Sequence, residues 1–418
     1  MNRVQASRSS FWKWSVTGLL LIATAINYMD RVALSGASVR ISAELGLSDT
    51  DYGNLELAFG WSFAVGSITF GFLADRFSLY WLYPFVLVSW SVVGMASGWT
   101  HGFNDLLVCR ALLGFFEAGH WPCALKTTYV LLNEKERTLG NSILQSGASI
   151  GAIITPQIIL LLMNDEHGSW RNVFVVVGSI GLWWAVAWLL ILRPRDLEQS
   201  SIKKTGVDPI SLRSIVFSRQ FLALAILVLG FQIVWHTYRV WLMKFLQTGR
   251  GYSEEFALNF NSIYYLFTDI GCILAGLLSL WLVQHYGLTA NRSRRLVYFG
   301  ACTLTSASVL LPWLDKGALL LLTLLMIGAG ALAIAPCYYG FLQDLSSDHV
   351  GRLTGLLALW AWAIASPIHS LLGFIADRFH SYDHGLVFAG IAPWAGAIAL
   401  TLLWKNRATT EPHLEKTS

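Results

Sequence analysis

Five ionisable residues lie inside stretches of the sequence that are otherwise apolar enough to cross a bilayer. They are Asp30, Arg31, Arg110, Glu117 and Asp269. A charged side chain at the centre of a bilayer costs about 2.5–3.5 kcal/mol on insertion scales. Such side chains therefore face a charged partner or a water-filled path, and they mark where ions or charged solutes move. The pattern indicates a protein that carries a charged solute across a membrane.

Helical spacing predicts that four of these side chains form one cluster. Arg110 and Glu117 are seven residues apart, which is nearly two turns, so they share one face of a helix. Counting 1.5 Å per residue from the centre of each span places Arg110 level with Asp30 and Arg31, about 10 Å toward the outside. Glu117 lies deeper in the membrane on the same stripe.

The chemistry of Asp30, Arg110 and Glu117 suggests a proton-coupling role for each of these three. Glu117, desolvated at the midplane, is the candidate for loading and releasing a proton, and Asp30 is a second candidate. Arg110 is then the switchable partner of Asp30 or Glu117, and it couples proton occupancy to solute binding. The alternative is a static buried ion pair that holds the two helices together.

Four other polar residues of the apolar segments have open alternatives. Lys126 either reaches the solute path, if Pro122 bends its helix, or extends to the membrane surface. His236 and Arg239 share one helical face and could close the outer end of the path, although His236 also fits a structural histidine. Asp269 is a candidate for ion coupling or for helix packing.

The composition is that of a membrane protein without a cofactor or metal site. The chain has 418 residues, of which 55% are hydrophobic and 13% charged, and its mean hydropathy is +0.54. Soluble domains carry roughly twice that share of charge. The five cysteines stand at unrelated spacings in apolar segments, which is typical of buried small side chains. The net charge of +4 does not indicate nucleic-acid binding, because the distribution of basic residues about the membrane explains it.

Twelve apolar segments predict twelve membrane-spanning helices. Their approximate limits are 12–36, 52–75, 80–99, 105–131, 138–163, 172–192, 219–246, 254–284, 295–313, 318–342, 352–375 and 386–404. The first segment has no cleavage site after it, so we interpret it as a retained span. The basic connection 193–218 is the one long polar gap, and it separates residues 1–192 from residues 219–418 as two six-helix halves.

Charge distribution predicts the orientation. Nineteen Lys and Arg residues fall on the side of the N-terminus and five on the other side. Because basic residues concentrate in cytoplasmic loops, both termini are expected to be cytoplasmic.

The run from Gly71 to Phe77, Gly-Phe-Leu-Ala-Asp-Arg-Phe, ends the second predicted span. It resembles the G-x-L-x-D-R signature that the major facilitator superfamily carries between its second and third helices. The resemblance implies that Gly71, Asp75 and Arg76 belong to a cytoplasmic gate motif that latches the two halves. A second Gly-Phe-x-Ala-Asp-Arg-Phe run, Gly373 to Phe379, is expected on the outer side after the eleventh span, and we assign it no function.

Four further segments resemble the anion:cation symporter branch of that superfamily. They are Asn27–Arg31, Arg110–Gly114 with Glu117 and Pro122 after it, Trp241–Leu246, and Asp269 with Gly271. Within the branch, Ala124–Thr127 and Ser146–Ala152 are most similar to hexuronate transporters. The segments Tyr338–Asp344 and Trp360–Trp362 depart from that subgroup, in helices that usually shape the sugar end of its site.

The resemblance implies an all-α integral membrane protein with the major facilitator fold, which works as a monomer in the bilayer. It also implies that Arg31 binds the substrate carboxylate and that Tyr28 and Asn27 contact sugar hydroxyls. The expected function is proton-coupled symport of a small organic anion, an acidic sugar such as a hexuronate or an aldonate, across the bacterial inner membrane. We expect H⁺ rather than Na⁺, because Glu117 is a single carboxylate without a cage of oxygen ligands.

Two alternatives remain open at this point. An efflux antiporter for apolar cations would require acidic residues without the arginines. An integral-membrane enzyme would require a cluster of His with Asp or Glu at one membrane face, and the ten histidines are scattered along the chain. We therefore expect a transporter and not an enzyme.

Overall fold

The computed structural model describes residues 9–132, 134–197, 212–345 and 350–404, and within these ranges the chain is helical and has no β-strand. The first part of the chain forms α1 (Ser10–Leu45), α2 (Asp49–Arg76), α3 (Leu79–Ser97), α4 (Phe103–Glu117), α5 (His120–Leu131), α6 (Glu134–Leu162) and α7 (Trp170–Ile191). The second part forms α8 (Leu212–Val216), α9 (Arg219–Lys244), α10 (Glu254–Tyr286), α11 (Ala290–Thr305), α12 (Ala318–Leu345), α13 (Val350–Phe379), α14 (Asp383–Ile391) and α15 (Pro393–Leu403). A π-helical turn, Phe245–Gly249, prolongs α9, and a 3-10 helix, Ser306–Trp313, prolongs α11.

Proline interrupts two of the expected spans. The ring nitrogen of Pro122 cannot donate to the carbonyl four residues earlier, and the helix breaks there between α4 and α5. The structure thus has a break where the sequence predicts a bend. Pro393 stands at the start of α15, directly after the end of α14. Each α4–α5 and α14–α15 pair still follows a single apolar segment of the sequence.

Ten helical segments of the described chain are long and apolar enough to cross a membrane. The segment α1 is not among them because Asn27, Asp30 and Arg31 lower its mean hydropathy. The helices α4 and α5 are each too short, although together they cover one expected span. The helices follow the twelve expected ranges. That the chain crosses the membrane twelve times remains a prediction. Large apolar side chains such as Trp183, which is 74% exposed, face outward from the bundle and suit contact with lipid acyl chains.

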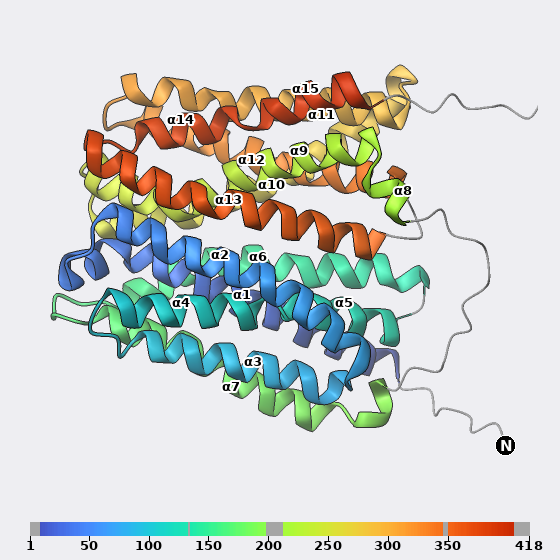
Figure 1. The fold of residues 1–418 in the computed structure, drawn as a ribbon, viewed down its shortest axis with the longest axis horizontal. Coiled ribbons are helices and arrows are strands. Elements are labelled where there is room, and N and C mark those ends of the chain that lie inside the picture. Colours follow the sequence, from blue (N-terminus) through green and yellow to red (C-terminus); the bar gives the residue numbers. More distant parts are fainter. Residues whose placement is uncertain (1–8, 133, 198–211, 346–349, 405–418) are drawn as a thin grey trace, which may run out of the picture.

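The helices form two groups that lie side by side along their length, as Figure 1 shows. We name α1–α7 the N-terminal bundle and α9–α15 the C-terminal bundle. The beginning of α1 and the end of α15 lie at the same end of the molecule, which we name the terminal face (right in Figure 1). The start of α2 and the end of α13 lie at the other end, which we name the opposite face. The helices α2 and α13 pack against each other between the bundles, and so do α6 and α10.

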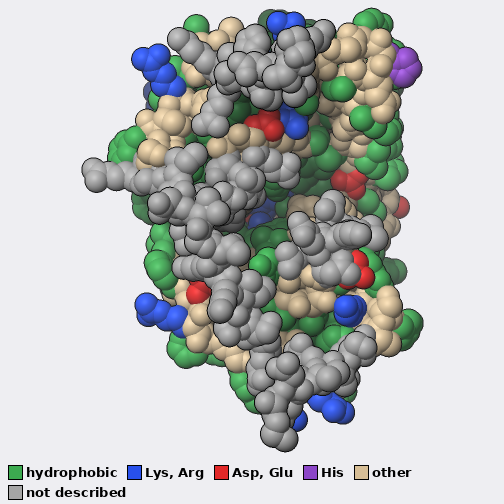
Figure 2. Space-filling view, turned by 90° about the vertical axis from the view of Figure 1, so that its right-hand side faces the viewer, with side chains coloured by type: hydrophobic (Ala, Val, Ile, Leu, Met, Phe, Trp, Pro, Cys, Tyr) green, Lys and Arg blue, Asp and Glu red, His purple; other side chains and the backbone are tan. Residues whose placement is uncertain are grey.

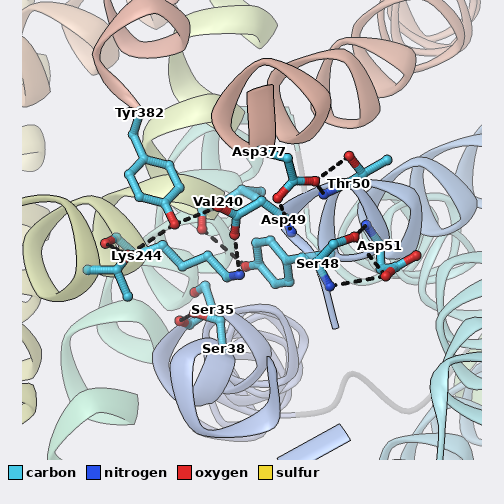
Figure 3. A network of polar contacts seen from close by, with 12 residues as sticks. Ser35, Ser38, Ser48, Asp49, Thr50, Asp51, Val240, Lys244, Asp377 and Tyr382 are labelled. Carbon is cyan, nitrogen blue, oxygen red and sulfur yellow. Dashed lines mark hydrogen bonds and ion pairs between the residues drawn. The ribbon is translucent and has the colours of Figure 1, made fainter. Parts of the chain in front are cut away.

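At the opposite face the two bundles are joined by charged and hydrogen-bonded contacts (Figure 3). Asp377 in α13 accepts hydrogen bonds from the backbone N–H groups of Asp49 and Thr50, at 3.0 and 2.8 Å. These are the first residues of α2, so the carboxylate lies at a helix N-terminus, where negative charge is stabilised. The Asp49 carboxylate in turn forms an ion pair with Lys244 at 2.5 Å and accepts a hydrogen bond from the Tyr382 hydroxyl at 2.7 Å.

Asp377 belongs to the second Gly-Phe-x-Ala-Asp-Arg-Phe run, which ends α13 at the opposite face. Gly373, at the start of that run, has no room for a side chain, because a Cβ atom there would clash with the Asp49 carbonyl oxygen. The glycine therefore permits the close approach that brings Asp377 to the end of α2. The run has a structural role, which the sequence did not reveal because the capped residues lie 327 and 328 positions away.

At the terminal face, ion pairs lie within each bundle. Lys126 contacts Asp75 at 3.0 Å in the N-terminal bundle, and Arg294 contacts Asp344 at 2.5 Å in the C-terminal bundle. Asp75, of the first Gly-Phe-x-Ala-Asp-Arg-Phe run, is 79% exposed. Figure 2 views this face, which is hollowed near its centre next to areas covered by residues of uncertain placement. The described contacts between the bundles thus close the opposite face.

Candidate functional site

The centre of the N-terminal bundle contains a buried ion pair between α1 and α4. The Nε atom of Arg31 donates a hydrogen bond to Oε2 of Glu117 at 2.8 Å, and Nδ2 of Asn27 donates to the same oxygen at 3.2 Å. The side chains of Arg31 and Glu117 are 3% and 0% exposed. A charge-assisted bond between such buried groups is strong, and separating the groups is costly unless another partner replaces the lost one. The predicted proximity of these two side chains is confirmed.

The break between α4 and α5 lies beside this ion pair. Glu117 is the last residue of α4, and His120 is the first residue of α5. The imidazole of His120 is buried and is within hydrogen-bond distance of the Thr24 hydroxyl, at 3.1 Å, and of the Tyr83 hydroxyl, at 2.9 Å. Both ring nitrogens of His120 are therefore occupied, and the histidine fixes the start of α5 against α1 and α3.

Aromatic rings surround the guanidinium group of Arg31. Its Cζ atom lies 5.4 Å from the ring centre of Tyr28, 5.3 Å from Phe59 and 4.9 Å from Phe63. A fourth ring, that of Trp362, lies 5.9 Å away and comes from α13 in the other bundle. Cation–π attraction stabilises the charge of the arginine here, and the ring faces form apolar walls around it.

A second group of charges is centred on Glu56 in α2. Nη2 of Arg110 donates to Oε1 of Glu56, and Nη2 of Arg239 donates to Oε2, each at 2.8 Å. All three side chains are 1% exposed. Arg110 belongs to the N-terminal bundle and Arg239 to the C-terminal bundle, so Glu56 bridges the two. The expectation that Arg110 is paired with Asp30 or Glu117 is wrong for this conformation, because Glu56 lies within reach and takes its place.

The carboxylate of Asp30 lies next to Gly94 of α3. The Asp30 side chain is 2% exposed, and its Oδ1 atom would lie 3.1 Å from a Cβ atom placed on Gly94. A Cβ atom at this point would make a tight contact with the carboxylate, which a glycine avoids. Asp30 is thus one turn or less from the ion pair along α1, but it is not a direct partner of Arg110 in the described structure.

His236 and Arg239 bring the C-terminal bundle to the same region. Nε of Arg239 donates to Nδ1 of His236 at 3.2 Å. The ring centre of His236 lies 4.4 Å from that of Trp362, which also lies 4.8 Å from Phe63 in the N-terminal bundle. These aromatic contacts place side chains of both bundles around Arg31.

Two sequence candidates lie outside this region. Nζ of Lys126 donates to the Ala74 carbonyl oxygen at 2.5 Å and to Asp75 at 3.0 Å, so the lysine is at the terminal face with the gate motif. Asp269 accepts a hydrogen bond from the Ser149 hydroxyl at 2.7 Å, between α6 and α10. The structure therefore brings together Asn27, Tyr28, Arg31, Glu117, Arg110, His236 and Arg239, and it separates Lys126 and Asp269 from them.

Several buried polar atoms of this region make no hydrogen bond with the described part of the chain. They include Arg31 Nη2, Glu117 Oε1, Asn27 Oδ1, Asp30 Oδ2, Arg110 Nε and Nη1, and Arg239 Nη1. Four of these seven are guanidinium nitrogens, and a buried donor without a partner costs about 1–3 kcal/mol or more when charged. A bound anion would supply the missing acceptors. The region is therefore suited to binding an anion.

Sequence reasoning missed Glu56, Trp362 and His120. Glu56 lies within the second apolar segment but only four residues from its expected start, where a charge is ordinarily exposed. An acidic residue one turn inside a predicted span was the available signal. Trp362 belongs to a segment that differs from the resembled subgroup, so that resemblance was no guide to it. His120 contacts only neighbouring helices and carries no spacing signal.

Comparison with known proteins decides the family. Residues 20–370 match the family described as the Major Facilitator Superfamily. The chain belongs to the Major Facilitator Superfamily. The family resemblance drawn from the sequence motifs is thereby confirmed, and the chain is a multi-pass membrane transporter rather than an enzyme.

Curated relatives and solved structures agree with this assignment. The chain is 27% identical over 405 residues to a probable L-galactonate transporter of Escherichia coli (strain K12), with 92% of this chain and 88% of the relative covered. It is 25% identical over 422 residues to the hexuronate transporter of the same strain, with 96% and 95% covered. A solved structure of a bacterial homologue of the human lysosomal transporter Spinster, in an inward-facing and occupied conformation, is similar with a TM-score of 0.76. That match has 17% identity and covers 95% of this chain and 97% of the other. This likeness confirms the fold.

Proposed function

We propose that this superfamily member is a proton-coupled symporter for a small organic anion, and that the anion is an acidic sugar such as a hexuronate or an aldonate. The observation that carries the proposal is the buried Arg31–Glu117 ion pair, with one nitrogen and one oxygen left without partners. The names of the two relatives, an L-galactonate and a hexuronate transporter, support the acidic-sugar class. A site for apolar cations would not present three buried arginines.

Coupling follows from competition for Arg31. A substrate carboxylate that binds the Arg31 fork takes the place of Glu117 Oε2. Glu117 then loses its nearest positive charge inside a desolvated site, and binding a proton removes the cost of leaving it charged. Proton loading and anion loading therefore favour each other.

Asp30 and Asp269 are further proton-coupling candidates, and Arg110 adjusts the charge near Glu117.

The surroundings of Arg31 suit a sugar. Tyr28 and Trp362 offer ring faces for the C–H groups of a sugar, while Asn27 offers a buried carbonyl oxygen without a partner in the described chain. His236 and Arg239 approach from the other bundle. Contacts from both bundles would allow a bound substrate to hold the two together.

The proposed setting is the bacterial inner membrane, with the terminal face in the cytoplasm and the protein acting as a monomer. In that orientation the described contacts close the outer side, and the molecule opens toward the cytoplasm. Transport would require the two bundles to rock about the central site, with Lys126, Asp75 and the gate motif taking part at the cytoplasmic side.

Uptake of labelled galactonate, glucuronate and galacturonate into proteoliposomes, with and without an inward proton gradient, tests the proposal. We compare the wild type with Arg31→Lys, which keeps the charge but loses the planar fork. The expected result is gradient-driven uptake by the wild type and a loss of about tenfold or more in the variant, corresponding to about 1.4 kcal/mol.

Arg171→Lys is the matched control, because Arg171 also forms an ion pair with a glutamate, Glu44, within the same bundle. The control is expected to transport like the wild type. Lack of uptake of every acid by the wild type would contradict the acidic-sugar assignment, and equal uptake by both lysine variants would contradict the role of Arg31.

A further inference from the structure

Glu56 lies between two arginines. Without Glu56, a solute carboxylate would fit this position. Each of its oxygens accepts one hydrogen bond of 2.8 Å, from Arg110 and from Arg239, and its side chain is 1% exposed. Charge-assisted bonds of this length are the usual way in which arginines bind carboxylates. Part of each guanidinium group still lacks a hydrogen-bond partner in the described chain. The arrangement is therefore that of an anion site filled by the protein's own side chain.

Tight helix packing holds Glu56 in this position. One turn before it, the Tyr52 hydroxyl donates to the Val240 carbonyl oxygen of α9 at 3.1 Å. On either side, α2 presents Gly53 and Gly60 to α13, and a Cβ atom at these positions would clash with the His369 carbonyl oxygen or with the Ser366 hydroxyl. Because α2 lies this close to the C-terminal bundle on both sides of Glu56, the carboxylate has little freedom to leave the two arginines.

The site is balanced in charge only when Glu56 is counted. Three buried arginines, Arg31, Arg110 and Arg239, face three buried carboxylates, Asp30, Glu56 and Glu117. A solute with one carboxylate can use Arg31, because Glu117 can be neutralised by a proton in exchange. A solute with a second carboxylate also needs a second positive group. The nearest such groups, Arg110 and Arg239, are already neutralised in part by Glu56.

We propose that Glu56 is an internal counter-anion that determines charge selectivity, so that the transporter accepts sugar acids with one carboxylate and rejects sugar acids with two. This inference rests on the proposed function, since it concerns the anion site around Arg31. Glu56 acts on a substrate by occupying the two arginines and by placing its negative charge near the position of the second carboxylate. A dicarboxylate must therefore displace a fixed side chain or remain next to it unpaired.

Galactonate and galactarate are suitable probes because they share a six-carbon chain and its hydroxyl configuration. They differ at one end, where galactonate has a hydroxymethyl group and galactarate a second carboxylate. Purified full-length protein in proteoliposomes takes up labelled galactonate, and each unlabelled acid competes. The ratio of the two half-inhibitory concentrations measures selectivity independently of the amount of active protein.

The wild type is expected to prefer galactonate by about tenfold or more. Glu56→Gln removes the charge with little change in shape, and it leaves Arg110 and Arg239 available to a second carboxylate. The preference is expected to fall by at least about tenfold or to reverse, which corresponds to about 1.4 kcal/mol or more. Glu56→Asp retains the charge and is expected to keep the preference for galactonate even if uptake slows.

Glu254→Gln is the matched control. Glu254 also forms an ion pair between the bundles, with Arg40, but at the opposite face. If selectivity changed merely because the bundles were held together less tightly, this variant would show the same change. An unchanged ratio in Glu254→Gln and a shifted ratio in Glu56→Gln support the inference.

Two results would overturn the inference alone. One is a wild type that transports galactonate but binds both acids equally, which can be measured even if no variant folds. The other is a folded Glu56→Gln protein with the wild-type ratio. If neither acid is bound by the wild type, the proposed function itself fails and this inference fails with it.

Discussion

At the scale of single residues, the guanidinium group of Arg31 is bound to an internal carboxylate through one nitrogen only, and a second nitrogen remains available to a ligand. Arg31 donates to Glu117 through Nε and keeps Nη2 without a partner in the described chain. Burial makes this charge expensive, and four aromatic rings lie around it. These observations fit a residue that exchanges one carboxylate for another rather than one that only holds helices together.

Replacing Lys126 tests whether this residue lies outside the substrate site, as the structure indicates. Its Nζ atom is bound to Ala74 and Asp75 at the terminal face, away from Arg31. We therefore predict that Lys126→Gln lowers the maximal uptake rate two- to tenfold, roughly the effect of about 0.5–1.4 kcal/mol on a conformational step, without changing KM for galactonate. A rise in KM comparable to that of Arg31→Lys would show that Lys126 binds substrate, as the sequence alone allowed. Initial uptake rates over a range of concentrations distinguish the two outcomes.

The sequence identified Arg31 and Glu117 because a charge within an apolar helix has few explanations. It could not assign the partner of Arg110, since three carboxylates lie within a few turns and only the rotation of α2 selects Glu56. Helical spacing places residues on faces of one helix, but it does not say which helix packs opposite. That information depends on close approaches such as Gly60 on Ser366, which involve residues hundreds of positions apart.

At the scale of elements, α2 and α13 carry the same Gly-Phe-x-Ala-Asp-Arg-Phe run at their C-terminal ends. They pack against each other in opposite directions, so the two runs lie at opposite faces of the molecule. At the opposite face, Asp377 caps the first turn of α2. At the terminal face, the corresponding Asp75 contacts Lys126 within its own bundle. The two runs have the same sequence pattern, but the aspartate of one makes contacts between the bundles and the aspartate of the other makes a contact within its own bundle.

Asp377→Asn is predicted to weaken the closed opposite face. The amide oxygen can still accept a hydrogen bond, but the negative charge at the N-terminus of α2 is lost, which costs about 1 kcal/mol. The population that is open at this face should rise about fivefold. Spin labels placed on the two bundles at this face would report the change as a larger share of long distances.

Asp383→Asn is the control for this measurement. Asp383 pairs with Arg250 at the same face, but both residues belong to the C-terminal bundle. Its replacement should leave the distance distribution unchanged. If both variants gave the wild-type distribution, the cap at α2 would not contribute to closure.

The limits of the elements were largely predictable, because apolar segments bounded by polar residues become helices in a bilayer. An irregularity at Pro122 was also predictable, since proline lacks the N–H group, although the sequence predicted a bend and the structure has a break. The π-helical turn Phe245–Gly249 and the 3-10 helix Ser306–Trp313 were not. Each directly follows the end of an α-helix, and no local pattern of residues predicts it.

At the scale of the whole molecule, two bundles contact each other through the centre and at one face. The polar contacts at the opposite face join α1, α2, α9, α10 and α13. The described polar contacts between the bundles thus close the opposite face. We propose that the terminal face is cytoplasmic, because nineteen Lys and Arg residues are expected on the side of the termini and five on the other.

Labelling of single introduced cysteines tests this orientation. Lys316 is exposed at the opposite face and Arg195 at the terminal face. In a background without the five native cysteines, we predict that a membrane-impermeant maleimide labels Lys316→Cys in intact cells. Arg195→Cys should be labelled only after the cells are permeabilised. The reverse pattern would contradict the orientation and place the open end outside the cell.

The central claim is that Glu117 couples a proton to the anion held by Arg31. Its most direct test compares accumulation and exchange of labelled galactonate in proteoliposomes that contain Glu117→Gln. Glutamine cannot release a proton, so the variant is predicted to exchange internal for external galactonate but to lose accumulation under an inward proton gradient. Glu44→Gln, which alters a glutamate paired with Arg171 at the opposite face, should accumulate galactonate like the wild type. Accumulation by Glu117→Gln at the wild-type level would contradict the account.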